Sequence, residues 1–278
     1  MRAMMKSVSG AAVAIFLLAA AESPQVSPAP APTYADLADL ALPAPLAAHV
    51  RLHRAVRLKP QEAGTVPAGN TRFFIEADVL SLLRGAEGLP SRVSYLADLP
   101  DGAGGKPPKP AKKSEFILIG STVPNRPGEI RLAAPEAHLP YTAERANTLR
   151  ALLREASAPG APPRITGIGK AFHAPGSLPG ESETQIFLQT AQSGPVSLSV
   201  LRRPGETPRW ALALGEMVDD AAAAPKPNSL LWYRLACTLP RSLPPQSLAD
   251  AEAEHRGPIQ ADYRLILDQL GPCARTRG

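Results

Sequence analysis

Residues 50–58 read VRLHRAVRL, and this stretch decides the fold class. Apolar residues occupy alternate positions from Val50 to Leu58, with arginine, histidine or alanine between them, and Arg54 interrupts the alternation once. A period of two is that of a β-strand, which places successive side chains on opposite faces of a sheet. The stretch therefore predicts a strand with one apolar and one cationic face.

The same period recurs outward along the chain. Residues 73–79 and 93–99 also alternate, and residues 116–119 (FILI) form a continuous apolar run that suits a strand buried on both sides. A short fifth strand is indicated at 130–132. After Thr142, a good N-cap residue, the apolar positions take up helical spacing.

A second set of strands follows the proline-rich joint 159–163, and a helix again comes last. The strand candidates are Ile165 to His173, Thr184 to Thr190, Val196 to Arg202, Arg209 to Val218, and Leu230 to Thr238. The closing helix has an apolar face that runs from Ile259 to Leu270, and Gly271 followed by Pro272 ends it. The sequence therefore predicts a mainly β fold of the α+β class, with two terminal helices and two antiparallel β-rich halves.

The two halves are expected to be domains at 49–158 and 163–278. Five short strands with tight Gly and Pro turns favour a small barrel in the first, and the OB-like barrel is one form that it can take. An OB barrel usually carries its helix between the third and fourth strands. Here the helical pattern follows the fifth strand.

The N-terminal 21 residues have the order of parts of an export signal. Arg2 and Lys6 precede an apolar run from Ala11 to Leu18, and three alanines then stand before Glu22. The run is too short to span a bilayer, which takes about 20 apolar residues, so cleavage without a transmembrane anchor is expected. The product is predicted to be periplasmic or secreted. Residues 22–48, rich in Pro and Ala, are expected to form an extended tether that packs poorly, apart from one short helical turn at 34–42.

Charge argues against nucleic acid as a partner. Removal of the leader with Arg2 and Lys6 lowers the formal net charge from +5 to +3, which is too small for a nucleic-acid-binding surface. Lysines 106, 109, 112 and 113 punctuate a loop with nothing apolar to bury. That loop either solubilises a connection between strands or contacts anionic lipid or polysaccharide of the cell envelope.

Cys237 and Cys273 are the only two cysteines. An even count in an exported chain predicts one disulfide, because the compartment is oxidising. Cys237 is expected near the end of the last strand and Cys273 directly after the last helix. The bridge would pin that helix to the second sheet.

The densest polar segment is residues 171–185, AFHAPGSLPGESETQ. A hairpin there could bring His173 opposite Glu181 and Glu183, which share one strand face. Acid/base chemistry is one interpretation, and a loop stabilised by local hydrogen bonds is the other. No metal site and no cofactor are predicted, because a metal needs at least three converging ligands in a recognisable spacing.

A second candidate surface is cationic. Arg51, His53 and Arg57 lie on the polar face of the first predicted strand, and they form either an anion-binding surface or simply a solvated one. Two further segments resemble known motifs only in part. The segment around Ser182 lacks the second glycine of a nucleophile elbow. The segment with glycines 167 and 169 lacks the third glycine of a dinucleotide-binding loop, so a strand with a bulge is expected at 167–169.

Four segments together resemble a family of exported proteins from sphingomonad-type Alphaproteobacteria with no assigned activity. They are TRFFIEADVLSLLRG (71–85), AFHAPGSLPGESETQIFLQT (171–190), VSLSVLRRPGETPRWALALGE (196–216) and SLLWYRLACTLP (229–240). The resemblance implies a bacterial envelope context and carries over no site residue.

These observations predict a binding or structural module of the periplasm rather than an enzyme. Its ligand would use the cationic strand face or a groove between the halves, and its partners would be an envelope protein, anionic lipid or polysaccharide. The alternative is a metal-assisted or acid/base hydrolase with its site around His173, Glu181 and Glu183. The reason for the first choice is that no convergent set of ionisable groups is evident.

Overall fold

The structure is a computed structural model that describes residues 31–85, 88–108, 110–191, 196–214 and 224–277. The predicted signal peptide and the first part of the predicted tether, to residue 30, lie outside the described residues. So does Lys109.

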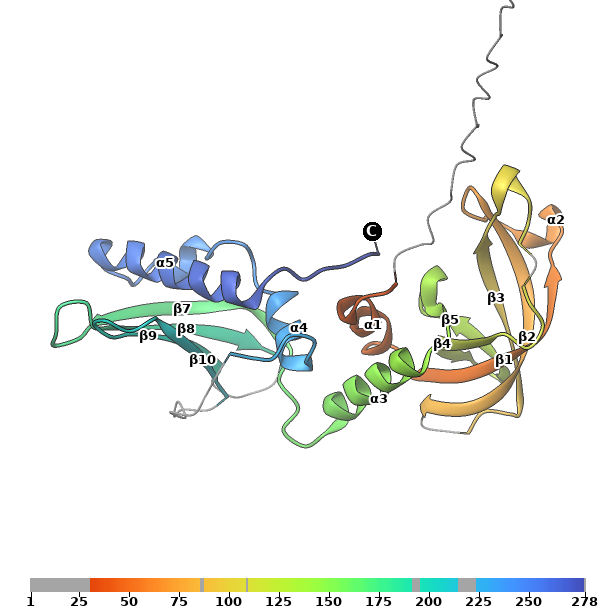
Figure 1. The fold of residues 1–278 in the computed structure, drawn as a ribbon, viewed down its shortest axis with the longest axis horizontal. Coiled ribbons are helices and arrows are strands. Elements are labelled where there is room, and N and C mark those ends of the chain that lie inside the picture. The colour runs from red at the N-terminus through yellow and green to blue at the C-terminus, as the bar shows by residue number, and fades with distance from the viewer. Residues whose placement is uncertain (1–30, 86–87, 109, 192–195, 215–223, 278) are drawn as a thin grey trace, which may run out of the picture.

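The first part of the chain is a closed five-stranded barrel (Figure 1). Its strands are β1 (Leu46–Arg57), β2 (Asn70–Arg84), β3 (Arg92–Pro100), β4 (Glu115–Val123) and β5 (Arg126–Leu132). The order is β1-β2-β3-β5-β4, and the pairing of β1 with β4 closes the barrel. β3 and β5 are parallel, and the other pairs are antiparallel. A sixth short strand, β6 (His138–Pro140), pairs with β4. The predicted small OB-like barrel is therefore present.

The barrel differs from the usual OB form in the position of its helix. Between β3 and β4 the chain forms only a 3₁₀ turn, η1 (Ala103–Gly105), and the helix α3 (Ala143–Ser157) comes after the barrel, as its sequence pattern predicts. Thr142 caps α3 by accepting a hydrogen bond from the Arg145 amide at 3.1 Å. Two other short elements are α2 (Pro60–Ala63), between β1 and β2, and η2 (Pro135–Ala137), before β6.

The alternating residues of the strands fill the barrel. The buried interior residues include Val50, Leu52, Ile75, Ala77, Val93, Tyr95, Leu118 and Ile130. The irregularity at Arg54 is now explained, because the β1–β2 register shifts between Leu52 and Arg54. A β-bulge of this kind adds a residue to one strand and bends it, which helps a short sheet to close.

One glycine is required for closure between β4 and β5. A Cβ atom on Gly120 would lie 2.1 Å from the carbonyl oxygen of Arg131. The two backbones therefore approach more closely than any side chain would allow.

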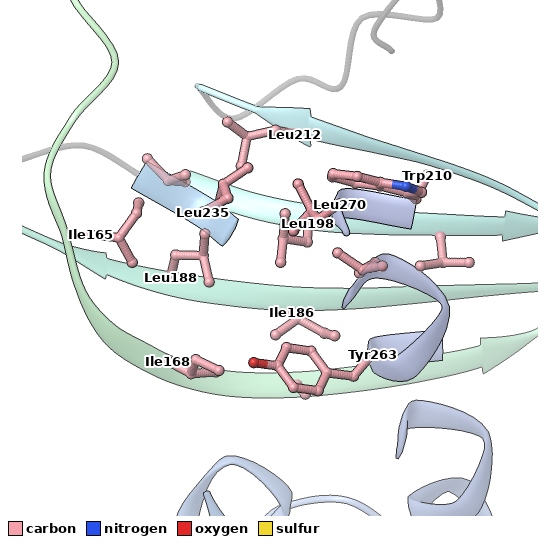
Figure 2. Packing of buried hydrophobic residues seen from close by; sticks show 14 of the residues in the cluster. Ile165, Ile168, Ile186, Leu188, Leu198, Trp210, Leu212, Leu235, Tyr263 and Leu270 are labelled. Carbon is pink, nitrogen blue, oxygen red and sulfur yellow. The ribbon is translucent and has the colours of Figure 1, made fainter. Parts of the chain in front are cut away.

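The second part of the chain is a four-stranded antiparallel sheet with helices on one face. Its strands are β7 (Ile165–Pro175), β8 (Ser182–Thr190), β9 (Val196–Arg202) and β10 (Arg209–Ala213), in the order β10-β9-β8-β7. The helix α5 (Ala253–Leu270), preceded by the turn η3 (Pro245–Leu248), covers the sheet (Figure 1). Figure 2 shows side chains of the helices, among them Leu235, Tyr263 and Leu270, packed on Ile168, Ile186, Leu188 and Leu198. The predicted bulge at the glycines 167 and 169 is present as register shifts in β7.

The predicted fifth strand of this half, Leu230 to Thr238, is wrong. This segment is the helix α4 (Leu230–Ala236), which begins where Ser229 accepts a hydrogen bond from the Trp232 amide at 3.2 Å. A short apolar run has no period long enough to separate strand from helix, and here the N-cap decides.

The helical turn predicted at 34–42 is confirmed, but the expectation that the tether packs poorly is wrong in its described part. Thr33 and Asp36 form a capping box at the start of α1 (Tyr34–Ala41), and the helix is largely buried. β1 then begins at Leu46, earlier than the predicted boundary at 49. Leu37 and Leu40 of α1 are buried in an apolar cluster, and the burial of these side chains stabilises the packed helix.

Helices join the barrel to the second sheet. α1, α3 and α4 lie between the two parts in Figure 1, and Leu230 of α4 belongs to the same apolar cluster as α1 and α3. The C-terminal tail then runs from α5 back to α1, and Cys273 in that tail is disulfide-bonded to Cys237 at the end of α4. The predicted disulfide is confirmed, but it links two helix ends instead of a helix and a strand. Among the helices of the described residues, none is both long and apolar enough to cross a bilayer.

Candidate ligand-binding site

The barrel has an open seam between β3 and β5. These two strands are paired only at Ser94 with Glu129 and at Tyr95 with Ile130. Beyond Tyr95 they separate, and the chain from Ala133 to His138, which contains η2, follows β5. A pocket lies on each side of Pro135, and both pockets are lined by Pro135 and Asp98.

The larger pocket, of about 860 Å³, is at the mouth of the barrel, and we call it the barrel-mouth pocket. Residues from the start of β2, the end of β3, the start of β4 and β6 line it, together with the C-terminal tail. Its apolar lining includes Leu99, Pro100, Phe116, Pro135, Leu139 and Pro140. Its size lies in the range of pockets that bind small molecules.

His138 is one of the polar residues that line this pocket. Its ring lies against Phe116, with ring centroids 4.0 Å apart, and near Tyr95, at 5.5 Å. Its Nε2 atom is buried and has no hydrogen-bond partner among the described residues. Burial lowers the pKa of His138 from 6.5 to about 4, so the ring is neutral at pH 7 and Nε2 can donate or accept one hydrogen bond.

The rim of the barrel-mouth pocket is charged. Arg277 NH2 lies 3.3 Å from Glu136 Oε2, and Arg145 donates a hydrogen bond to the carbonyl oxygen of Pro140. The Nε atom of Arg277 is buried and has no partner in the described chain. Burial is the main influence on the pKa of Arg145 and lowers it. The lining thus holds two guanidinium groups and two carboxylates, and the second carboxylate, Asp98, is hydrogen-bonded to Arg72.

The smaller pocket is a groove of about 640 Å³ on the outer face of β2, β3 and β5. Phe74 and the exposed Leu96 supply its apolar floor. Arg72 donates two hydrogen bonds to Asp98, each 2.7 Å long, which fixes the wall shared with the barrel-mouth pocket. The hydroxyl of Tyr95 is buried without a partner in the part that the structure describes, and burial raises its pKa.

The structure does not bring His173, Glu181 and Glu183 together. His173 pairs with Thr184 across β7 and β8, so it lies on the face opposite to Glu183. Glu181 accepts hydrogen bonds from the amides of Ser177 and Leu178 in the turn between the strands. The predicted constellation is thus divided between two faces of the sheet and a turn.

His173 instead joins a network between the sheet and α5. Its Nδ1 atom is 2.8 Å from Thr184 Oγ1, which donates a hydrogen bond to the buried Asp262. Arg202 donates to the same carboxylate at 2.7 Å. Burial lowers the pKa of His173. The negative charge of Asp262 raises this pKa, whereas the positive charges of His255 and Arg202 lower it further. The network ties α5 to β8 and β9.

Beside this network, ligand atoms of Glu252, Glu254 and His255 lie within 4.8 Å of one another. Both carboxylates are exposed at the start of α5, and His255 is half-buried. Of the described residues this is the one group with a spacing that a metal ion could bridge, and exposed acidic groups often approach in this way without one.

The cationic strand face is largely neutralised by carboxylates. Arg51 lies 2.9 Å from Glu115, and His53 Nδ1 lies 3.5 Å from Asp78. Arg57 is exposed at the end of β1, and no ion pair is recorded for it within the described chain. These three residues line neither pocket.

Sequence reasoning missed His138, Tyr95, Asp98 and Arg277. The one local signal was a histidine, with Glu136 two residues before it, in the mainly apolar segment AAPEAHLPY. The residues meet only because the seam of the barrel and the returning tail place them there. The lysine-containing loop, expected either to solubilise a connection between strands or to contact anionic lipid or polysaccharide, contributes Pro108 and Pro110 to the lip of the barrel-mouth pocket.

Comparison with protein-family models and with curated proteins finds no match for this chain.

Proposed function

We propose that the chain is an exported, non-enzymatic binding module of the bacterial periplasm and that its ligand occupies the barrel-mouth pocket. The observation that carries the proposal is an apolar pocket of about 860 Å³ with His138 in its lining, and the neutral, buried Nε2 atom of that histidine has no partner among the described residues. An apolar pocket with a few convergent polar groups is the usual form of a small-molecule site. A buried polar atom without a protein partner favours a ligand or water there.

The leader sequence and the disulfide support the periplasmic part of the proposal. A bridge between Cys237 and Cys273 is stable in an oxidising compartment and would be rare in the cytosol. The resemblance to exported sphingomonad-type proteins supports the same location. Cell fractionation tests it: full-length protein with its first methionine retained inside the cytoplasm would contradict export.

Binding is tested with a neutral, environment-sensitive apolar dye added to the mature protein. Leu99→Trp places a larger side chain on the wall of the pocket and should raise the dissociation constant of the dye by about tenfold or more. Leu201→Trp, at an exposed position of β9 far from the pocket, is the matched control and should not change it. Equal binding to both variants, or no binding to the wild-type protein, would contradict the proposed function.

A further inference from the structure

We infer that the ligand of the barrel-mouth pocket is a single-chain anionic amphiphile, with its hydrocarbon chain in the pocket and a carboxylate or phosphate head at the rim. This inference rests on the proposed function and names its ligand class. Two features of the pocket carry it: a proline-rich wall with few backbone N–H donors, and a rim where Arg145 bonds a carbonyl oxygen instead of a carboxylate, next to a loop with exposed lysines.

The wall is poor in donors because it is rich in proline. The prolines that line the pocket are Pro32, Pro67, Pro100, Pro108, Pro110, Pro135 and Pro140. Each of them lacks a backbone N–H group. A peptide or a sugar carries polar groups along its whole length, and the proline-rich part of the wall offers few backbone N–H groups to pair with them. A hydrocarbon chain has no such groups, so it is the occupant that this wall accepts.

The rim supplies the complementary charge. Arg277 bonds Glu136 through NH2, and its side chain remains 25% exposed, so the guanidinium group can also contact an oxyanion at the rim. Guanidinium groups suit carboxylates and phosphates because several N–H donors lie in one plane. Arg145 adds a second guanidinium on the same rim.

The loop that provides the lip extends this positive charge. Pro108 and Pro110 line the pocket, and Lys106, Lys112 and Lys113 are exposed on the same loop. No ion pair is recorded for these three lysines within the residues described. The approach to the pocket is therefore cationic, which favours the encounter with an anion.

Calorimetric titration tests the head group with three ligands of one chain length, each below its critical micelle concentration. They are a fatty acid, the corresponding fatty alcohol and a lysophospholipid with an anionic phosphate head. We expect one or both anionic ligands to bind at least about tenfold more tightly than the alcohol, the size of one charge-assisted hydrogen bond. Preference between the two anions distinguishes a carboxylate source from a phosphate source.

Charge variants locate the head group. Arg277→Gln should weaken binding of the anion by about tenfold and leave the alcohol unchanged, and Glu136→Gln should strengthen binding of the anion because it removes the competing carboxylate. Arg126→Gln, in an exposed ion pair on the other groove, is the matched control. A melting curve of each variant checks that the tail remains in place.

The results separate the two proposals. If the dye and the alcohol bind as tightly as the anions, or if neither rim variant changes the selectivity, the ligand class is wrong while the proposed function stands. If neither the dye nor any amphiphile binds, both are wrong.

Discussion

The hydroxyl of Thr276 donates a 2.6 Å hydrogen bond to Asp36 Oδ2, and this contact joins residues 240 positions apart in the chain. The backbone amides of Thr276 and Arg277 also donate to the Asp36 carboxylate. The backbone amide of Thr33, the N-cap residue of α1, donates to the same carboxylate. The tail is therefore fixed by Asp36 near its end, by the ion pair of Arg275 with Asp39, and by the disulfide of Cys273. Arg277, which we place in the ligand site, is held in place by these anchors.

Asp36→Asn should lower the free energy of unfolding by about 2 kcal/mol, because a charged acceptor of several hydrogen bonds is lost in a buried place. Urea unfolding at pH 7 measures this. Asp78→Asn, which breaks an exposed ion pair with Arg92, is the control and should cost less than about 1 kcal/mol.

The same variant should change the acid dependence. Burial raises the pKa of Asp36, but hydrogen bonds from Thr276 and Thr33 outweigh it and bring the pKa from 3.8 to about 2. A lowered folded-state pKa stabilises the protein above the unfolded value and loses that effect as pH falls through 3.8 to about 2. Unfolding of the Asn variant should depend less on pH in that window, and an unchanged slope would contradict the role of this carboxylate.

His138 predicts a second pH dependence, in a higher window. Burial favours the neutral ring, so the unfolded chain binds the proton more tightly than the folded one, and stability is complete above pH 6.5 and falls as the pH drops towards 4. The full effect is on the order of 3 kcal/mol. His138→Phe should make the melting temperature depend less on pH between these values. The pKa of His173 is also lowered by burial, so part of the pH dependence should remain in the variant, and the effect of His138 is the difference between wild type and variant.

Loss of the disulfide should destabilise the protein by about 4 kcal/mol in the chain-entropy model, given a separation of 36 residues between the two cysteines. The variant that replaces both Cys237 and Cys273 by serine should melt at a lower temperature than wild type. It should also bind the anionic amphiphile more weakly, because the tail loses one anchor. Two free thiols in the mass of unreduced periplasmic protein would contradict the bridge.

The buried carboxylate of Asp262 is expected to matter more than any surface ion pair. Asp262→Ala leaves Arg202 and Thr184 without their acceptor, and breaking a buried pair in this way costs about 3–5 kcal/mol. A double-mutant cycle with Arg202→Met measures the coupling. The exposed pair of Arg54 and Glu76 is the control cycle, and its coupling should stay below about 1 kcal/mol.

Much of the fold could be predicted from local patterns. The period of two in residues 50–58 corresponds to β1, and its single irregularity at Arg54 is a bulge. Thr142 marks the start of α3, and Gly271 ends α5 in a left-handed conformation with φ of 70°. These features are local, because alternation and capping depend on neighbours within a few residues.

Other elements could not be read locally. Leu230 to Ala236 is a helix instead of a strand, because packing against α3 and α5 decides what a short apolar segment forms. The helical turn at Tyr34 to Ala41 was expected, but its burial depends on contacts with distant segments. The hairpin of His173 was expected correctly, but the face on which each side chain points follows from a register that includes bulges.

The sequence by itself determined a mainly β chain in two parts, the cysteine pair that forms the disulfide, and the absence of a recognisable catalytic motif. Only the tertiary structure decided where a ligand could bind, because Leu99, Phe116, His138 and Arg277 come from four separate segments of the chain. Closure of the barrel and the return of the C-terminal tail bring these four residues together at the mouth of the barrel. No local sequence pattern predicts this proximity, because burial and unpaired polar atoms are properties of the packed chain.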